Sequence, residues 1–327
     1  MQKLVTIFGG SGFVGRYVAR RMARAGWRVR VACRRPNEAH FVRMYGSVGQ
    51  VEPVFANIRS DASVEAALMG ADAVVNCVGI LAEAGANRFD AVQAEGAGRV
   101  ARIAAAMGLR DMVQISAIGA DADSHSDYAR SKAEGEAAVR RHMPRAVILR
   151  PSILFGAEDR FFNRFAGMAR RLPMVPVVGA DTRFQPVFVD DVAAAAQAAL
   201  DGRAEPGIYE LGGPETLTFR EMMERMLAEI RRRALIVSVP FLAAWPMAWA
   251  LDGLQKVSLG LFHNGVLTVD QLRNLRRDNV ATGDHPGFEA LGIAPTALEA
   301  VLEDYLWRFR PSGQYAEIKE SARNLRT

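Results

Sequence analysis

Short apolar runs alternate with amphipathic stretches along the first half of the chain. The runs have the length and β-branched content of buried strands, and the stretches between them have the spacing of helices packed on one face. The predicted strands are 3–8, 28–33, 51–55, 73–78, 111–116 and 146–150. The predicted helices are 14–25, one after the fourth strand up to about residue 107, and one through Tyr128 to about Arg141. Repeated β-α-β units predict an α/β fold, a doubly wound parallel Rossmann sheet.

This alternation loosens after Pro151, where proline and glycine become frequent. Two runs, 188–189 and 208–211, predict strands that return to the sheet. Helices are predicted to follow them, at 190–200 and 219–232. The sequence therefore predicts a Rossmann core (1–150), a smaller lobe with returns to the sheet (151–310) and a polar tail (311–327).

The most apolar stretch, from Ala234 to Leu251, carries no charge but contains Pro240 and Pro246. A membrane-spanning helix needs about 20 apolar residues, and this stretch is too interrupted to be one. Two interpretations stay open. The stretch is either core of the smaller lobe or an apolar surface, with Trp245 in it, that meets a partner.

Composition narrows the possible functions. Of 41 basic residues only four are lysines, and the basic positions are scattered without interleaved aromatics, which argues against nucleic-acid binding. Cys33, Cys77 and the five isolated histidines have no metal-ligand spacing, so no metal site is expected. The first strand begins almost at Met1, so no targeting peptide is expected, and the sequence favours a bacterial cytoplasmic chain or a mature form.

The first strand runs directly into a glycine-rich loop. Gly9 allows a sharp turn off the strand, Gly12 lets the backbone approach a pyrophosphate, and Gly15 lets the next helix lie close to the sheet. Phe13 and Val14 begin that helix, whose N-terminal amides can bind phosphate. The loop, between an apolar strand and an amphipathic helix, predicts a dinucleotide site.

The end of the second strand selects the nucleotide. Sites that prefer NAD place a carboxylate here for the ribose hydroxyls, whereas this chain has Arg34 and Arg35. Guanidinium groups match a 2′-phosphate bidentately, so NADP(H) is the predicted cofactor.

Three residues at later strand ends complete the predicted cofactor site. Asn57, after the third strand, can offer its amide to the adenine edge. Val78 and Gly79 end the fourth strand where the cofactor ribose should cross, and Gly79 permits close approach of the backbone.

A catalytic constellation is predicted on the helix after the fifth strand. Tyr128 and Lys132 are four residues apart and therefore share one helix face, and Ser116 ends the preceding strand. A cationic Lys132 would lower the pKa of the phenol and grip the ribose. Tyr128 would then exchange a proton with a carbonyl that Ser116 orients.

With these features the chain resembles the short-chain dehydrogenase/reductase superfamily, in its extended and atypical branches, over about residues 3–230. The segments 150–156, 186–193 and 209–214 are similar to later hallmarks of the extended branch. The resemblance implies that Pro151 and Ile153 lie beside the nicotinamide.

Two stretches, 152–165 and 184–187, resemble a narrower family, the alpha-subcomplex subunit nine accessory subunits of respiratory complex I. This resemblance implies a tightly held NADPH with a structural or assembly role. It also implies other subunits of complex I as partners, docking on the peripheral arm near the quinone site, and contact with the membrane surface. In a bacterium the place would be the cytoplasmic face of the inner membrane.

Two departures bear on catalysis. The extended branch usually has Thr-Gly where this chain has Gly9-Gly10, and Gln93 stands where that branch carries an asparagine. An incomplete proton relay would weaken catalytic turnover more than it weakens cofactor binding. Two hypotheses therefore remain. One is an accessory subunit of complex I, not an independent catalyst, in which the catalytic residues are vestigial. The other is a free NADP-dependent oxidoreductase or nucleotide-sugar epimerase.

Overall fold

The computed structural model describes residues 2–258, 264, 267–311 and 313–315. Seven parallel strands form the main sheet in the order β11-β6-β5-β4-β1-β2-β3. The strands are β1 (Leu4–Phe8), β2 (Arg28–Cys33), β3 (Val51–Phe55), β4 (Ala73–Asn76), β5 (Asp111–Ile115), β6 (Val147–Pro151) and β11 (Gly207–Leu211). The predicted doubly wound Rossmann sheet is confirmed, including the return at 208–211 to the sheet edge.

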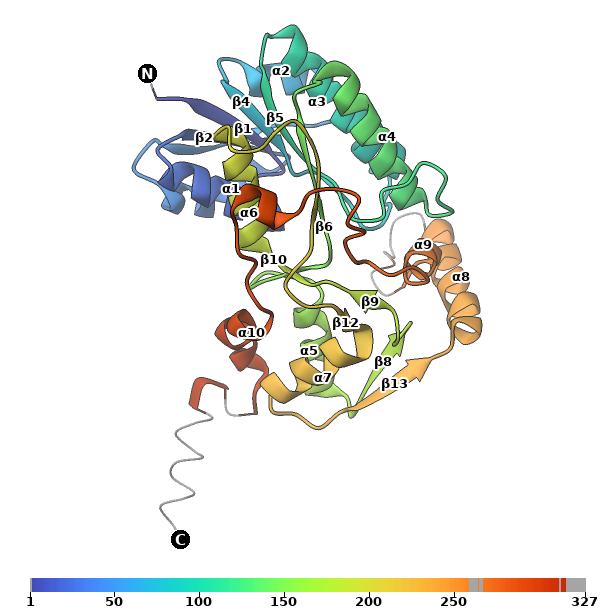
Figure 1. The fold of residues 1–327 in the computed structure, drawn as a ribbon. Coiled ribbons are helices and arrows are strands. Elements are labelled where there is room, and N and C mark those ends of the chain that lie inside the picture. Colours follow the sequence, from blue (N-terminus) through green and yellow to red (C-terminus); the bar gives the residue numbers. More distant parts are fainter. Residues whose placement is uncertain (1, 259–263, 265–266, 312, 316–327) are drawn as a thin grey trace.

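Helices cover both faces of this sheet (Figure 1). One face packs on α1 (Phe13–Arg24) and α6 (Val189–Leu200), and the other on α2 (Asp61–Leu68), α3 (Glu95–Ala106) and α4 (Asp127–His142). Alternate residues of β1 enter the two cores, since Val5 and Ile7 face α1 whereas Phe8 packs with the α2–α4 layer.

The predicted return to the sheet at 188–189 is wrong. Val187 and Phe188 form β10, which pairs with β7 (Leu154–Phe155) in a separate two-stranded sheet. Val187 contributes to the core under α1 and α6, so the buried apolar pattern that suggested a sheet strand reflects burial at the junction of the lobes.

The smaller lobe has its own core. Three helices surround it, α5 (Phe162–Arg171), α7 (Phe219–Glu229) and α10 (Glu299–Leu306), with the paired strands β8 (Met174–Val178) and β13 (Leu235–Val239). A second pair, β9 (Arg183–Phe184) and β12 (Leu217–Thr218), is antiparallel. Rings of Phe161, Phe165 and Phe219 lie 5.2–5.5 Å apart between centroids, within the range of favourable aromatic pairs.

The apolar stretch 234–251 forms β13 and most of α8 (Phe241–Val257). Among the described side chains of α8 only the small Ala244 and Ala248 are buried, whereas Leu242 is 87% and Trp249 76% exposed. The helix therefore turns its larger apolar groups outward, which supports the surface interpretation over the core interpretation. Of the described helices, none has the length and apolar character to cross a membrane. The predicted polar tail lies mostly outside the described residues.

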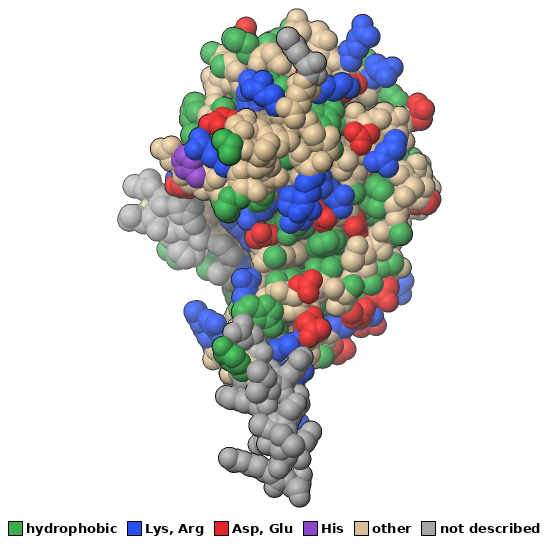
Figure 2. Space-filling model, turned by 90° about the vertical axis from the view of Figure 1, so that its left-hand side faces the viewer, with side chains coloured by type: hydrophobic (Ala, Val, Ile, Leu, Met, Phe, Trp, Pro, Cys, Tyr) green, Lys and Arg blue, Asp and Glu red, His purple; other side chains and the backbone are tan. Residues whose placement is uncertain are grey.

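Basic and acidic side chains lie interspersed on the side of the molecule shown in Figure 2. Ion pairs also join neighbouring helices. Arg20 and Arg21 of α1 contact Asp190 of α6 at 3.2 and 2.8 Å. These pairs join the Rossmann core to the first turn of α6.

Candidate functional site

The glycine loop lies between β1 and α1 and has the close backbone contacts of a phosphate cradle. Gly9 has φ +72°, and its N–H donates to the carbonyl of Ala32 at 2.9 Å. A Cβ at Gly15 would lie 2.3 Å from the Gly9 carbonyl oxygen, so only glycine fits there. Gly12 is the N-cap of α1 and offers no side-chain cap, which leaves the amides at Phe13 and Val14 open to an anion. The loop fits a dinucleotide.

Arg34 and Arg35 lie on exposed positions directly after β2, the strand whose end contacts the glycine loop through Ala32. Arg34 donates from Nη1 to Oδ1 of Asn87 at 3.0 Å, and Arg35 pairs with Glu38 at 3.2 Å. The hydrogen bond of Arg34 and the ion pair of Arg35 are both exposed and therefore contribute little to stability. A 2′-phosphate could replace Asn87 and Glu38 as their partners. Oδ1 of Asn57 accepts from the N–H of Arg59 at 3.1 Å, which orients the side-chain amide predicted to meet the adenine edge.

Sequence reasoning missed Arg16, the residue after the last loop glycine. Its guanidinium donates to the carbonyls of Ser11 at 3.1 Å and Gly12 at 3.3 Å. It also pairs with Glu158 at 3.3 Å and lies 4.8 Å from the ring centroid of Phe41. Arg16 therefore fastens the phosphate loop to the segment that follows β7, and its position beside the loop was the available signal.

The segment that follows β4 packs against the loop. A Cβ at Gly9 would lie 3.2 Å from Cγ2 of Val78, and a Cβ at Gly79 would lie 3.3 Å from Nζ of Lys132. Gln93, in the π-helical turn Asp90–Ala94, is the other neighbour, with Oε1 at 3.5 Å from that position.

Gln93 supplies a second observation that fits a bound cofactor. Its side chain is 4% exposed, and Nε2 donates to Oγ of Ser131 at 3.1 Å. Its Oε1 is buried and has no donor among the described residues. An acceptor left unpaired in this way is unfavourable, and a ribose hydroxyl passing Gly79 would satisfy it.

Tyr128 and Lys132 share one face of α4, as the spacing predicts. Nζ of Lys132 lies 5.8 Å from the centroid of the Tyr128 ring and 3.4 Å from the carbonyl oxygen of Ile115. Ser116 does not point toward them, because its hydroxyl donates to Oε1 of Glu136 at 2.5 Å. To orient a substrate oxygen, that hydroxyl would have to leave a buried carboxylate.

The pKa values of Tyr128 and Lys132 do not match the proton exchange that the sequence predicts. Burial, and then the carboxylate of Asp270, raise the pKa of Tyr128 to about 12. Burial lowers the pKa of Lys132 to about 8, against the opposing influence of Glu136 and Cys77. The expectation that Lys132 lowers the pKa of the phenol is therefore wrong for this site without its cofactor, because burial of both groups dominates.

Asp270 is the second residue that the sequence analysis missed. It belongs to α9 (Val269–Asn274) and caps the start of α4. Its carboxylate accepts from Oγ of Ser126 at 2.8 Å, the N–H of Asp127 at 2.7 Å and the N–H of Tyr128 at 3.3 Å. A residue of the C-terminal part thereby sits directly over the start of the helix that carries Tyr128.

Behind Ser116 lies a buried charge network. Arg150 pairs with Glu136 at 2.6 Å and approaches Glu210 at 3.8 Å. Glu210 also accepts from the N–H of Thr282 at 2.6 Å. The network joins β6 and β11 to the segment that follows α9.

That segment runs along the carboxyl ends of the strands, beside the residues predicted to face the nicotinamide. The carbonyl of Asn279 accepts from Oγ of Ser152 at 2.7 Å and from the N–H of Gln185 at 3.2 Å. Pro151 is buried at the end of β6, and Ile153 packs against the core of the smaller lobe. The C-terminal segment therefore ties both lobes together on the side where an extended-branch enzyme would bind substrate.

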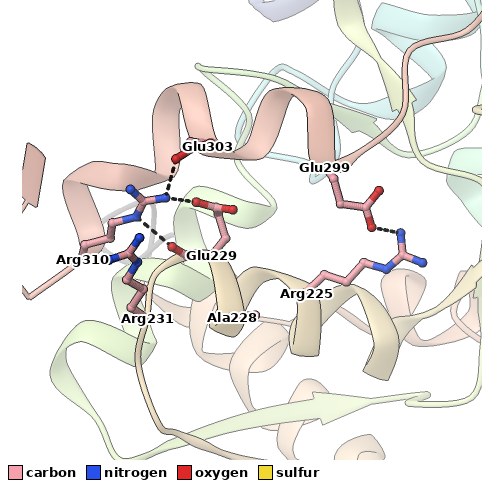
Figure 3. Close-up of a pocket in the computed structure, with 7 residues that line it drawn as sticks. All are labelled: Arg225, Ala228, Glu229, Arg231, Glu299, Glu303 and Arg310. Atoms are coloured by element: carbon pink, nitrogen blue, oxygen red, sulfur yellow. Dashed lines mark hydrogen bonds and ion pairs between the residues drawn. The ribbon is translucent and has the colours of Figure 1, made fainter. Parts of the chain in front are cut away.

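A hollow between α7 and α10 is lined by charged side chains (Figure 3). These two helices lie in the smaller lobe, away from β1 and α1 (Figure 1). Arg225 pairs with Glu299, and Arg310 pairs with Glu229 and Glu303. Charges of opposite sign satisfy one another here, so we interpret the hollow as a structural ion-pair network.

Comparison with known proteins places these features in a family. The profile of the NAD dependent epimerase/dehydratase family matches residues 5–212. NADH dehydrogenase (ubiquinone) 1 alpha subcomplex subunit 9, mitochondrial, of Arabidopsis thaliana is 33% identical over 316 residues, which cover 95% of this chain and 79% of the relative.

Two further similarities concern enzymes. The ceramide reductase of Caulobacter vibrioides is 33% identical over 191 residues, which cover 58% of this chain and 59% of that enzyme. The crystal structure of Thermus thermophilus UDP-glucose 4-epimerase in complex with NAD superposes with a TM-score of 0.67 at 20% identity, covering 94% of this chain and 99% of that one. The last similarity concerns the fold alone.

Proposed function

The chain belongs to the NAD dependent epimerase/dehydratase family, and within it we propose an accessory subunit of respiratory complex I that holds NADPH without turning it over. The observation that carries this proposal is the similarity to alpha subcomplex subunit 9 along 95% of the chain. That similarity extends through the smaller lobe, where an enzyme of different function would be expected to diverge.

The cofactor side of the proposal rests on the fit of the site. The glycine loop and the open N-terminus of α1 would hold the pyrophosphate, and Arg34 and Arg35 would hold the 2′-phosphate that distinguishes NADP from NAD. Lys132 and the orphaned Oε1 of Gln93 would bind the ribose beside Gly79. When bound, the nicotinamide could supply a hydride; the proposal gives it a structural role instead.

The absence of turnover is supported by the state of the catalytic residues. The Ser116 hydroxyl is engaged by Glu136, and the pKa of Tyr128 is raised, not lowered. A phenol whose pKa lies far above neutral pH is a poor match for general acid–base catalysis near pH 7.

The proposed place is the cytoplasmic face of a bacterial inner membrane, in contact with other subunits on the peripheral arm near the quinone site. A direct test is affinity purification of the tagged full-length chain from detergent-solubilised membranes. The proposal expects subunits of complex I and NADH:quinone activity in the eluate, together with NADPH released on denaturation. A chain recovered alone and only from the soluble fraction would contradict it.

A second candidate function is a free NADP-dependent reductase or nucleotide-sugar epimerase. The similarity to ceramide reductase favours it, since that relative shares 33% identity over the matched part. Its test is NADPH oxidation by the purified chain with a ceramide-type ketone. Turnover that is lost in Tyr128→Phe would support this function over the first.

A further inference from the structure

A cavity of about 610 Å³ lies where the start of α4 meets α8 and α9, apart from the cofactor cradle. Figure 1 shows α8 and α9 side by side, below α4. Four arginines line the cavity, Arg130, Arg273, Arg276 and Arg277, against one lining carboxylate, Asp127. The charge of the wall therefore favours an anion.

Three of these arginines have partners within the protein. Arg130 pairs with Asp127, and Arg273 donates to the carbonyl of His125 at 3.1 Å and lies 3.7 Å from Asp127. Arg277 pairs with Asp121 at 3.1 Å, just outside the cavity. Their positive charges are thus largely compensated, and they serve mainly to shape the wall.

Arg276 is different. In the described part of the chain its guanidinium has no hydrogen-bond acceptor; it lies 5.5 Å from the ring centroid of Phe241 and 5.4 Å from that of Trp245. Trp245 also lines the cavity, and its indole N–H is buried without a described acceptor. The guanidinium of Arg276 is exposed, so an oxyanion in the cavity can pair with it, whereas the indole N–H of Trp245 is covered by its neighbours.

Helix α8, beside the cavity, carries exposed apolar side chains that a ligand of the cavity could cover. Leu242, Trp245 and Trp249 follow one another at spacings of three and four residues, so they form one ridge along α8. Leu242 and Trp249 are 87% and 76% exposed, on either side of the tryptophan that reaches the cavity. Tryptophan and leucine beside arginine are typical of surfaces at the membrane–water interface.

We propose that this cavity binds the phosphate headgroup of an anionic phospholipid, whose acyl chains lie along the ridge of Leu242, Trp245 and Trp249. A soluble phosphate ester offers the same oxyanion but leaves the apolar ridge uncovered. The lipid pairs with the Arg276 guanidinium and covers the ridge at the same time. This site does not depend on the proposed function, because it concerns the isolated chain and a membrane.

The experiment uses the full-length purified protein with its cofactor and phosphatidylcholine vesicles with or without phosphatidylglycerol, in a flotation assay. We expect binding only to the vesicles with phosphatidylglycerol. Arg276→Gln should weaken that binding about fivefold, the effect of one arginine near an anionic surface. Leu242→Ser should weaken it as well. Arg203→Gln is the matched control, an exposed arginine that pairs with Asp201 at the end of α6, and should bind like the wild type.

Equal binding by Arg276→Gln and wild type, or equal losses in Arg276→Gln and Arg203→Gln, would overturn the proposal in favour of diffuse charge attraction. The soluble source is tested with glycerol 1-phosphate. If it raises the melting temperature through Arg276 while Leu242→Ser leaves vesicle binding unchanged, the cavity takes a free phosphate ester and the lipid assignment is wrong. Circular dichroism of each variant checks that the fold is intact.

Discussion

Asp270 accepts a hydrogen bond from the backbone N–H of Tyr128 at 3.3 Å, although 142 residues separate them in the chain. The carboxylate also accepts from the hydroxyl of Ser126, the N-cap of α4, and from the N–H of Asp127, so it fixes the start of the helix and places a negative charge near the phenol. The C-terminal lobe thereby acts directly on the residue that an enzyme of this fold would use as its acid.

The first prediction concerns this contact. Asp270→Asn keeps the size of the side chain but removes its charge, so the pKa of Tyr128 should fall from about 12. The weaker cap should also lower the free energy of unfolding by about 1 kcal/mol. Ultraviolet difference titration of the phenol, compared with Tyr128→Phe, measures the first effect, and denaturant unfolding measures the second. An unchanged titration would show that Asp270 does not influence the phenol.

The second prediction concerns the choice of nucleotide. Arg34→Ala combined with Arg35→Ala should weaken NADPH binding about tenfold or more and leave NADH binding nearly unchanged, because charge-assisted bidentate contacts to the 2′-phosphate are lost. Calorimetry with both nucleotides provides the measurement. Arg43→Ala is a suitable control, an exposed arginine that pairs with Glu52 at 2.6 Å. An unchanged ratio of the two affinities would contradict the assignment of NADP.

The third prediction follows from the buried ammonium of Lys132. Its pKa is lowered from 10.5 to about 8, so above pH 8 the folded state releases a proton that the unfolded state keeps. Since the unfolded state then binds more protons, stability rises with pH in that window, by about 1 kcal/mol per pH unit. The cofactor-free wild type should therefore gain stability relative to Lys132→Met between about pH 8 and 10. Urea unfolding at several pH values tests it, and parallel curves for the two proteins would refute the burial of a titrating ammonium.

Local patterns were enough to predict most of the Rossmann core. The strands 28–33 and 51–55 begin and end where the sequence placed them, because β-branched runs bounded by loops report burial directly. The glycine loop could also be predicted, since its spacing follows from backbone geometry that only glycine allows.

Contacts between segments far apart in the chain could not be predicted from local sequence patterns. The capping box Thr268–Gln271 marks the start of α9, but nothing local says that Asp270 reaches Tyr128. In the same way Ser116 directly follows β5, which ends at Ile115, but nothing local says that its hydroxyl donates to Glu136 on the following helix. Side-chain partners of this kind depend on the packing of elements far apart in the chain, which periodicity does not encode.

The central claim, a structural cofactor in a complex I subunit, is tested most directly by two chromosomal variants and a control. Gly15→Ala places a Cβ 2.3 Å from the Gly9 carbonyl and should abolish NADPH retention, whereas Tyr128→Phe removes only the phenol hydroxyl. Gly253→Ala, in open space on α8, is the matched control.

The measurement is the complex I content and the NADH:quinone activity of membranes from these strains. The account predicts a large loss in Gly15→Ala, because a ligand bound only to the folded state stabilises it. It predicts near wild-type values in Tyr128→Phe and Gly253→Ala. Wild-type complex I in all three strains, together with an NADPH-dependent reduction that disappears in Tyr128→Phe, would contradict it.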